Sequence, residues 1–404
     1  MSVFCARKAV YNRENDVCSY ELLVGDKENN NEEPVEKALD YICNYATEGL
    51  MRFTNNKKAF VKFTEMSLIE EIPDLIGKEN IIVNISGDVT VNDKVKKVIK
   101  KMFNNSFQIA YDISSINDKY DLLDEFVHIY KINFKTIKSE DRDKIINSIY
   151  KLKNKHGILA FNISNQAEYK EAFDKGIEYF SGDYFSKPVE INNNNVEVRN
   201  SARFSLIIEL LNEELEIDRV ENIVKSDLSI SYKLIKFLNS AVFGFTEKIK
   251  SIRQAIMLLG KEELRKWLTL IIVSDIQRDN NEELVSNTII RARFCELIAA
   301  KIDKEKSSMA FMVGLFSDFQ NYVNKDINEV VAELNFQDEI NAALLGEENT
   351  LWYILELEKS YEKMDVVNIK EYCRKLDLDE NSLFELYSKS IEWLNDSKIN
   401  FNKM

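Results

Sequence analysis

The sequence has 404 residues, of which 45% are hydrophobic and 30% are charged, and its formal net charge at pH 7 is −14. This composition excludes a disordered or fibrous chain, and the length predicts two or three domains of roughly 100–200 residues each. The negative charge argues against a nucleic-acid partner, because no run of Lys and Arg is dense enough to predict a basic patch.

Membrane insertion and secretion are not expected either. No apolar stretch approaches the length of a membrane span, and the opening segment MSVFCARKAVYNREN lacks the apolar core of a secretory signal. The sequence therefore predicts a cytoplasmic protein.

The first half of the chain alternates short β-type runs with helical patterns. A hairpin opens it, in which VFCARKAVYN turns at RENDV into CSYELLV. Six runs rich in β-branched and aromatic residues follow: AFVKFT (59–64), IIVNIS (81–86), FQIAYDI (107–113), HIYKINF (128–134), GILAFNI (157–163) and IEYFSGDYF (177–185). Strands separated by helices predict a parallel sheet, and this number of strands predicts closure into a TIM-barrel-like (β/α) barrel. Chemistry in such a barrel lies at the C-terminal ends of the strands.

The second half is predicted to be all-helical. Pro34, Pro73 and Pro188 are the only prolines, so nothing in the last 216 residues interrupts a helix in this way. Residues 189–200 contain four consecutive Asn and are typical of a linker. We therefore predict a barrel over 1–188, a linker over 189–200 and a helical domain over 201–404. One apolar helical face is predicted from three- and four-residue spacing, at Leu228, Tyr232, Ile235, Leu238 and Val242.

Cysteine and histidine usage points away from metal and redox chemistry. The five cysteines are scattered and form no CxxC pair, which favours buried, reduced thiols over a disulfide framework or a zinc cluster. His128 and His156 are the only histidines, and both precede predicted strands, where edge or loop positions are more common than ligands. No cofactor is predicted.

The first half resembles the EAL family of cyclic di-GMP phosphodiesterases over residues 3–188. The matching motifs are YELL (20–23), AFVKFTE (59–65), FQIAYD (107–112), IYKINF (129–134) and YFSGDYFSKP (179–188). The resemblance implies a two-metal hydrolytic site in which carboxylates hold divalent cations that activate a water.

Three positions of that site are retained according to the resemblance. Glu21 matches the signature Glu, Asp112 the first Asp of a paired-Asp motif, and Lys131 the lysine that helps to orient the attacking water. The other ligand or clamp positions are occupied by Lys62, Asn84, Ile113, Asn133, Phe161, Ser181 and Gly25. Two carboxylates are too few for two metal ions, so the resemblance predicts a degenerate EAL domain with no catalytic and no metal-binding residues.

Residues 201–400 resemble the HDOD domain, a helical relative of HD-type phosphohydrolases. The marks are SDLSISYKLIKFLNSAVFG (226–244), SIRQAIMLLG (251–260), RARFCELIA (291–299) and VGLFSDFQN (313–321). Ser317 and Asp318 stand at the metal-binding doublet, and no histidine follows His156. No metal site is therefore predicted in this domain.

The leading interpretation is a bacterial EAL–HDOD protein that transmits signals through protein–protein contact and does not catalyse a reaction. We expect an unidentified protein partner on the helical domain and a homodimer through the barrel. Two alternatives stay open: a cyclic di-GMP receptor that does not hydrolyse its ligand, and a residual cyclic di-GMP phosphodiesterase.

The loss of metal ligands leaves a charge problem in the barrel. Two carboxylates in a partly dehydrated cavity repel each other, and a cation has to compensate them. The sequence offers two, and we predict an ion-pair network of Lys62, Lys131, Glu21 and Asp112. In the alternative arrangement, Lys62 turns to solvent and pairs with nothing.

Overall fold

The protein is described here by a computed structural model. The described residues are 4–25, 49–87, 89–113, 123–152, 154, 156–186, 216–226, 230, 234, 252–254, 256–260, 264, 267–268, 282–318, 326–334 and 337–402. The predicted linker 189–200 and the predicted apolar face from Leu228 to Val242 lie outside them. The chain divides into two compact units: Met1–Lys187 with Ser360–Lys370 and Asp379–Phe384, and Pro188–Lys359 with Glu371–Leu378 and Glu385–Met404.

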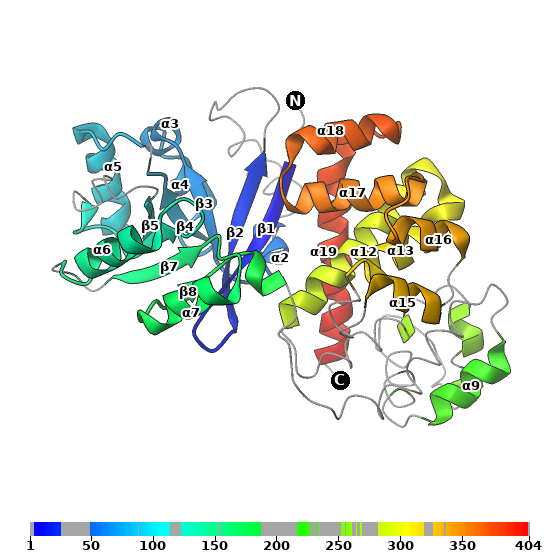
Figure 1. Cartoon of the computed structure of the whole chain (residues 1–404). Helices are drawn as coiled ribbons and strands as arrows, with labels where there is room; N and C mark the ends of the chain where they lie inside the picture. The colour runs from blue at the N-terminus through cyan, green and yellow to red at the C-terminus, as the bar shows by residue number, and fades with distance from the viewer. Residues whose placement is uncertain are drawn as a thin grey trace. The chain divides into compact units, whose positions relative to one another are not determined.

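The first unit contains a closed eight-stranded barrel in which the strands follow one another in chain order (Figure 1). Strands β1 and β2 form the predicted hairpin and pair antiparallel, and β1 meets β8 antiparallel at Tyr11 and Phe180. All neighbouring strands from β2 to β8 are parallel. The strands are β1 Phe4–Tyr11, β2 Val17–Gly25, β3 Ala59–Phe63, β4 Ile81–Ile85, β5 Gln108–Ile113, β6 Ile129–Asn133, β7 Gly157–Phe161 and β8 Tyr179–Phe180. The predicted barrel is confirmed.

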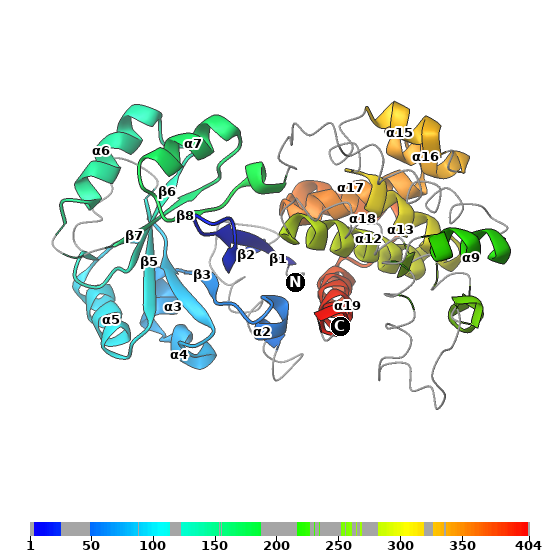
Figure 2. The same cartoon turned by 90° about the horizontal axis from the view of Figure 1, so that it is seen from below.

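Helices cover the outside of the strands, as Figures 1 and 2 show. They are α2 Gly49–Phe53, α3 Glu65–Ile69, α4 Ile72–Ile76, α5 Asp93–Asn104, α6 Ser139–Ile149 and α7 Gln166–Asp174, and a 3₁₀ turn η2 spans Asp183–Ser186. Asn92 and Asn165 start α5 and α7 by accepting hydrogen bonds from backbone N–H groups of the first turn. Helices α3 and α4 contact β3 and β4, respectively.

Every element described from residue 216 onward is helical, which confirms the predicted all-helical class for this part of the chain. The elements are α9 Ile217–Ser226, α12 Glu282–Ile302, η4 Lys304–Lys306, α13 Ser307–Phe316, α15 Ile327–Leu334, α16 Asp338–Leu344, α17 Thr350–Glu362, α18 Val366–Lys375, η5 Glu380–Ser382 and α19 Leu383–Asn402. Helices α12 and α13 approach closely at Gly314, where an added Cβ would lie 2.8 Å from the Cα of Ala292. A glycine is needed there because any side chain would meet backbone.

The described residues show the state of four cysteines and the apolar length of the helices. Cys5, Cys18, Cys295 and Cys373 are free thiols, and burial raises the pKa of Cys5 to about 12. Within the part of the chain that the structure describes, no helix is both long and apolar enough to cross a bilayer.

Candidate functional site at the barrel mouth

The site lies one layer above the apolar core of the barrel. That core contains Phe60, Ile82, Ala110, Ile129 and Leu159, with Val10 beside them. Side chains two positions further along a strand point the same way, because successive residues of a strand alternate between its faces. The next layer toward the strand C-termini therefore consists of Lys62, Asn84, Asp112, Lys131 and Phe161.

Lys131 forms the centre of this layer. Its Nζ lies 2.6 Å from Glu21 Oε1 and 3.0 Å from Asp112 Oδ1, and its side chain is 0% exposed. The rings of Phe161 and Phe60 enclose it further, with centroids 4.8 and 5.5 Å from Nζ. Strand register explains the contact, because Asp112 and Lys131 are direct partners on β5 and β6. One ammonium thus forms ion pairs with two carboxylates, and aromatic side chains surround it.

The pKa shifts of this cluster follow from its charges. Burial raises the pKa of Asp112, and the nearby Glu21 carboxylate raises it further, while Lys131 opposes both. Burial alone would lower the pKa of Lys131, but Asp112 and Glu21 outweigh it and raise that pKa above its usual value. Lys131 is therefore an ammonium at neutral pH and has no free electron pair for nucleophilic or base chemistry.

Asn84 is an additional member that sequence reasoning treated only as a lost ligand. Its Nδ2 donates a 3.3 Å hydrogen bond to Asp112 Oδ2. Asn84 Oδ1 and Ser181 Oγ are buried without a hydrogen-bond partner among the described residues. Asn133 instead faces its own loop, where its Oδ1 accepts hydrogen bonds from Lys135 N and Asn162 Nδ2.

Lys62 does not join the network in the way the sequence predicts. Its side chain is exposed, and among the described residues it makes no ion pair with Glu21 or Asp112. The strand order explains the separation from Asp112: Lys62 is paired with Asn84 on β4, and β4 lies between Lys62 and Asp112 on β5. Two strand spacings amount to about 10 Å, so Lys62 contributes only a weak field that lowers the pKa of Asp112.

The cluster does not fit a pair of divalent cations. Mg²⁺ and related ions need several oxygen ligands, preferably anionic ones. Here the two carboxylates share one ammonium, and any ion bound between them would lie beside that positive charge. No group of three or more His, Cys, Asp and Glu side chains suited to a metal occurs among the described residues.

At the doublet position of the helical unit, Asp318 pairs with an internal cation, Arg291, which the sequence did not predict. Arg291 on α12 pairs through Nη1 with Asp318, and its Nε lies 3.1 Å from Oε2 of Glu358 on α17. Ser317 donates its hydroxyl to Gly314 O at 2.9 Å. Glu358 is 0% exposed, and the Arg291 guanidinium provides a positive charge beside this buried carboxylate. Nothing in the spacing of the sequence indicates that Arg291 and Glu358 meet.

The two histidines lie at the opposite end of the barrel, before β6 and β7. His128 Nδ1 accepts a 3.1 Å hydrogen bond from Ile109 N. Burial lowers the pKa of His128 most, and the charges of the nearby His156 and Lys58 lower it further. His156 contacts Asp124 through Nε2 and the carbonyl of Val127 through Nδ1. They belong to the strand connections and lie apart from the cluster at Lys131.

This chain is similar to one domain family, to two curated proteins and to solved structures of EAL proteins. The HDOD domain family matches residues 201–343. The uncharacterized protein YuxH of Bacillus subtilis is 31% identical over 97% of this chain and 98% of that protein. The cyclic di-GMP phosphodiesterase CdgJ of Vibrio cholerae is 25% identical over 98% of this chain and 93% of that protein. A solved structure, a standalone EAL protein from Vibrio cholerae O395 with c-di-GMP bound, is 19% identical over 47% of this chain and 93% of that chain, at a TM-score of 0.35.

Proposed function

The chain belongs to the EAL–HDOD family of cyclic di-GMP signalling proteins, with YuxH and CdgJ as relatives, and we propose that it transmits signals through protein contacts without hydrolysing cyclic di-GMP. The barrel and the helical unit act as binding platforms in this proposal. The setting we propose is the cytoplasm, and the partner is a protein.

The observation that carries the proposal is that Glu21 and Asp112 pair with Lys131 while Asn84 and Phe161 occupy neighbouring positions where the resemblance places metal ligands. The Lys131 ammonium lies between the two carboxylates, and its side chain has no exposed surface. Hydrolysis by a two-metal site needs these carboxylates as metal ligands, because the metals activate the water and stabilise the leaving oxygen. A covalently attached ammonium supplies positive charge but has no coordination site for a water.

An enzymatic alternative is favoured by one observation. CdgJ is named a cyclic di-GMP phosphodiesterase, and this chain retains Glu21, Asp112 and Lys131. A receptor that binds cyclic di-GMP without hydrolysing it is the second alternative. The residues argue against tight binding, because Gly25 stands where the resemblance places a phosphate-binding Arg, and a bidentate guanidinium has no equivalent in a glycine backbone.

Product analysis tests the proposal against the enzymatic alternative. The full chain is incubated with cyclic di-GMP and Mg²⁺ or Mn²⁺ beside a Glu21→Gln variant, which keeps the shape of the side chain but removes its charge. We expect no linear dinucleotide from either protein. Linear product from the wild type, absent with Glu21→Gln, would contradict the proposal.

Calorimetry with cyclic di-GMP separates the platform from the receptor. We expect no binding heat with or without divalent cations at ligand concentrations up to about 100 μM, which corresponds to less than about 5.5 kcal/mol of binding free energy. Saturable binding that Asp112→Asn weakens would establish the receptor alternative instead.

A further inference from the structure

Helix α5 carries a concentrated positive charge on the surface of the first unit. Its sequence is DKVKKVIKKMFN, with Asp93 as the only acidic residue. Val95, Ile99 and Met102 are buried, and α5 packs beside α3. The exposed face, called here the lysine face, consists of Lys94, Lys96, Lys97, Lys100 and Lys101. This local charge stands out because the whole chain carries −14.

The lysine face works against the stability of its own helix. Lys96 and Lys100 form one i,i+4 pair of like charges, and Lys97 and Lys101 another, each unfavourable by about 0.2–0.5 kcal/mol. Lys94 also lies in the first turn, where the helix dipole disfavours a cation. Lys101 pairs with Glu71 and Asp74, whereas the other four make no ion pair with any described residue. Four uncompensated ammonium groups on one helix are suited to an external acidic surface.

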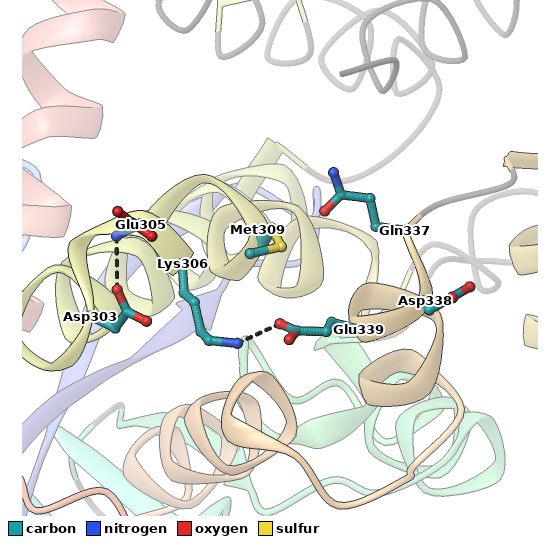
Figure 3. Close-up of a pocket in the computed structure, with 7 residues that line it drawn as sticks. All are labelled: Asp303, Glu305, Lys306, Met309, Gln337, Asp338 and Glu339. Atoms are coloured by element: carbon teal, nitrogen blue, oxygen red, sulfur yellow. Dashed lines mark hydrogen bonds and ion pairs between the residues drawn. The ribbon is translucent and has the colours of Figure 1, made fainter. Parts of the chain in front are cut away.

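The second unit presents a surface of the opposite charge. A cavity of about 570 Å³ is lined by Asp303, Glu305, Lys306, Met309, Gln337, Asp338 and Glu339 (Figure 3). Lys306 is its only cation and pairs with Glu339 at 2.5 Å. Four carboxylates and one ammonium therefore line the cavity, and the acidic groups Glu305, Asp338 and Glu339 are exposed. We call this surface the acidic cavity.

We propose that the lysine face of one copy docks on the acidic cavity of a second copy. This inference rests on the proposed function, since it names a partner for a protein that acts by contact. Opposite charge selects the pair of surfaces. Met309 lies among the carboxylates of the cavity, so the methylene stems of docked lysines can pack on it while their ammonium groups reach the carboxylates. A contact between two different surfaces is heterologous, so two such contacts close a dimer only if a twofold axis relates the copies.

Sedimentation velocity of the full chain at two ionic strengths provides the first measurement. The Debye length falls from about 30 Å at 0.01 M salt to about 3 Å at 1 M, so a contact made by exposed charges is strong only in the first buffer. We expect reversible association at low salt and monomers at high salt. A monomer under both conditions at tens of micromolar protein, on the order of 10⁻⁵ M, would overturn the proposal.

Charge reversal identifies the two surfaces. Lys97→Glu with Lys100→Glu lowers the formal charge of the lysine face from +5 to +1, and Asp338→Lys with Glu339→Lys changes that of the acidic cavity from −3 to +1. Each double variant alone should lose at least about tenfold in association, or about 1.4 kcal/mol. An equimolar mixture of the two double variants should associate again, because the intact lysine face of one variant then meets the intact acidic cavity of the other. A general effect of net charge or misfolding would not produce this rescue.

A matched control uses lysines elsewhere on the same unit. Lys144 on α6 and Lys170 on α7 are also exposed, and their reversal to Glu changes the net charge equally. This control should associate as the wild type does. Association unaffected by reversal at Lys97 and Lys100, or no rescue in the mixture, would overturn the proposal. A wild type that stays monomeric but binds anionic vesicles through Lys97 and Lys100 would assign the lysine face to a membrane surface instead.

The outcomes are independent of those that test the proposed function. Hydrolysis of cyclic di-GMP would overturn the proposed function and leave the association unchanged. Loss of association would remove the second copy as partner while the barrel stayed inactive.

Discussion

Replacing Lys131 with Met is expected to destabilise the protein strongly. The substitution keeps most of the apolar stem between the rings of Phe60 and Phe161 but removes the ammonium. Glu21 and Asp112 then remain as two buried carboxylates, with side chains only 15% and 12% exposed, without their shared cation.

The distances set the size of the effect. At 2.6 and 3.0 Å, and with an effective dielectric constant of about 20, each attraction to the ammonium is about 6 kcal/mol before desolvation is counted. Because desolvation offsets most of this, removing one partner of a buried ion pair costs about 3–5 kcal/mol in unfolding free energy. Adding Glu21→Gln and Asp112→Asn to Lys131→Met removes the unpaired charges as well, and should recover most of that loss.

Urea unfolding followed by circular dichroism measures these differences for the barrel transition. Lys62→Met is the matched control, since it removes an exposed lysine from the same layer and should change the unfolding free energy by less than about 0.5 kcal/mol. Equal effects of Lys131→Met and Lys62→Met would refute the assignment of Lys131 as the internal cation. Additivity of the three substitutions would refute the coupling between these charges.

Three further predictions concern pH and packing. Because burial raises the pKa of Asp112 in the folded state, its contribution to stability is favourable at acid pH and is lost as pH rises through that pKa; Asp112→Asn should remove this dependence from melting curves recorded between pH 4 and 8. The pKa of His128 is lowered in the folded state, so its contribution to the unfolding free energy is present above about pH 6.5 and is lost as pH falls through the lowered pKa. His128→Asn should make the melting temperature depend less on pH in this range. Gly314→Ala should lower the melting temperature through a cost of about 1–3 kcal/mol, because its Cβ would lie 2.8 Å from Ala292 Cα.

The barrel could be predicted because local patterns determine its strands. Each β-type run in the sequence corresponds to an observed strand, as AFVKFT does to Ala59–Phe63, and the order of runs fixes the order of parallel strands. Lys131 beside Asp112 also follows once β5 and β6 are neighbours in register. The order of the runs also places β4 between Lys62 and Asp112, but the sequence does not reveal that the Lys62 side chain is exposed.

The missed features all depend on contacts between distant segments. Arg291 and Glu358 meet only because α12 and α17 pack together in the second unit. The lysine face was missed for another reason: the total charge of −14 conceals five lysines within the twelve residues of α5. A window of helical length would have detected this charge.

The most direct test of the central claim is a titration of the full chain with Mn²⁺, followed by electron paramagnetic resonance of the free ion. The claim is that Lys131 holds the position between Glu21 and Asp112 and thereby excludes divalent cations from the barrel. The account predicts no stoichiometric Mn²⁺ binding that depends on Glu21. Binding of one or two Mn²⁺ ions by the wild type, lost in Glu21→Gln, would contradict it.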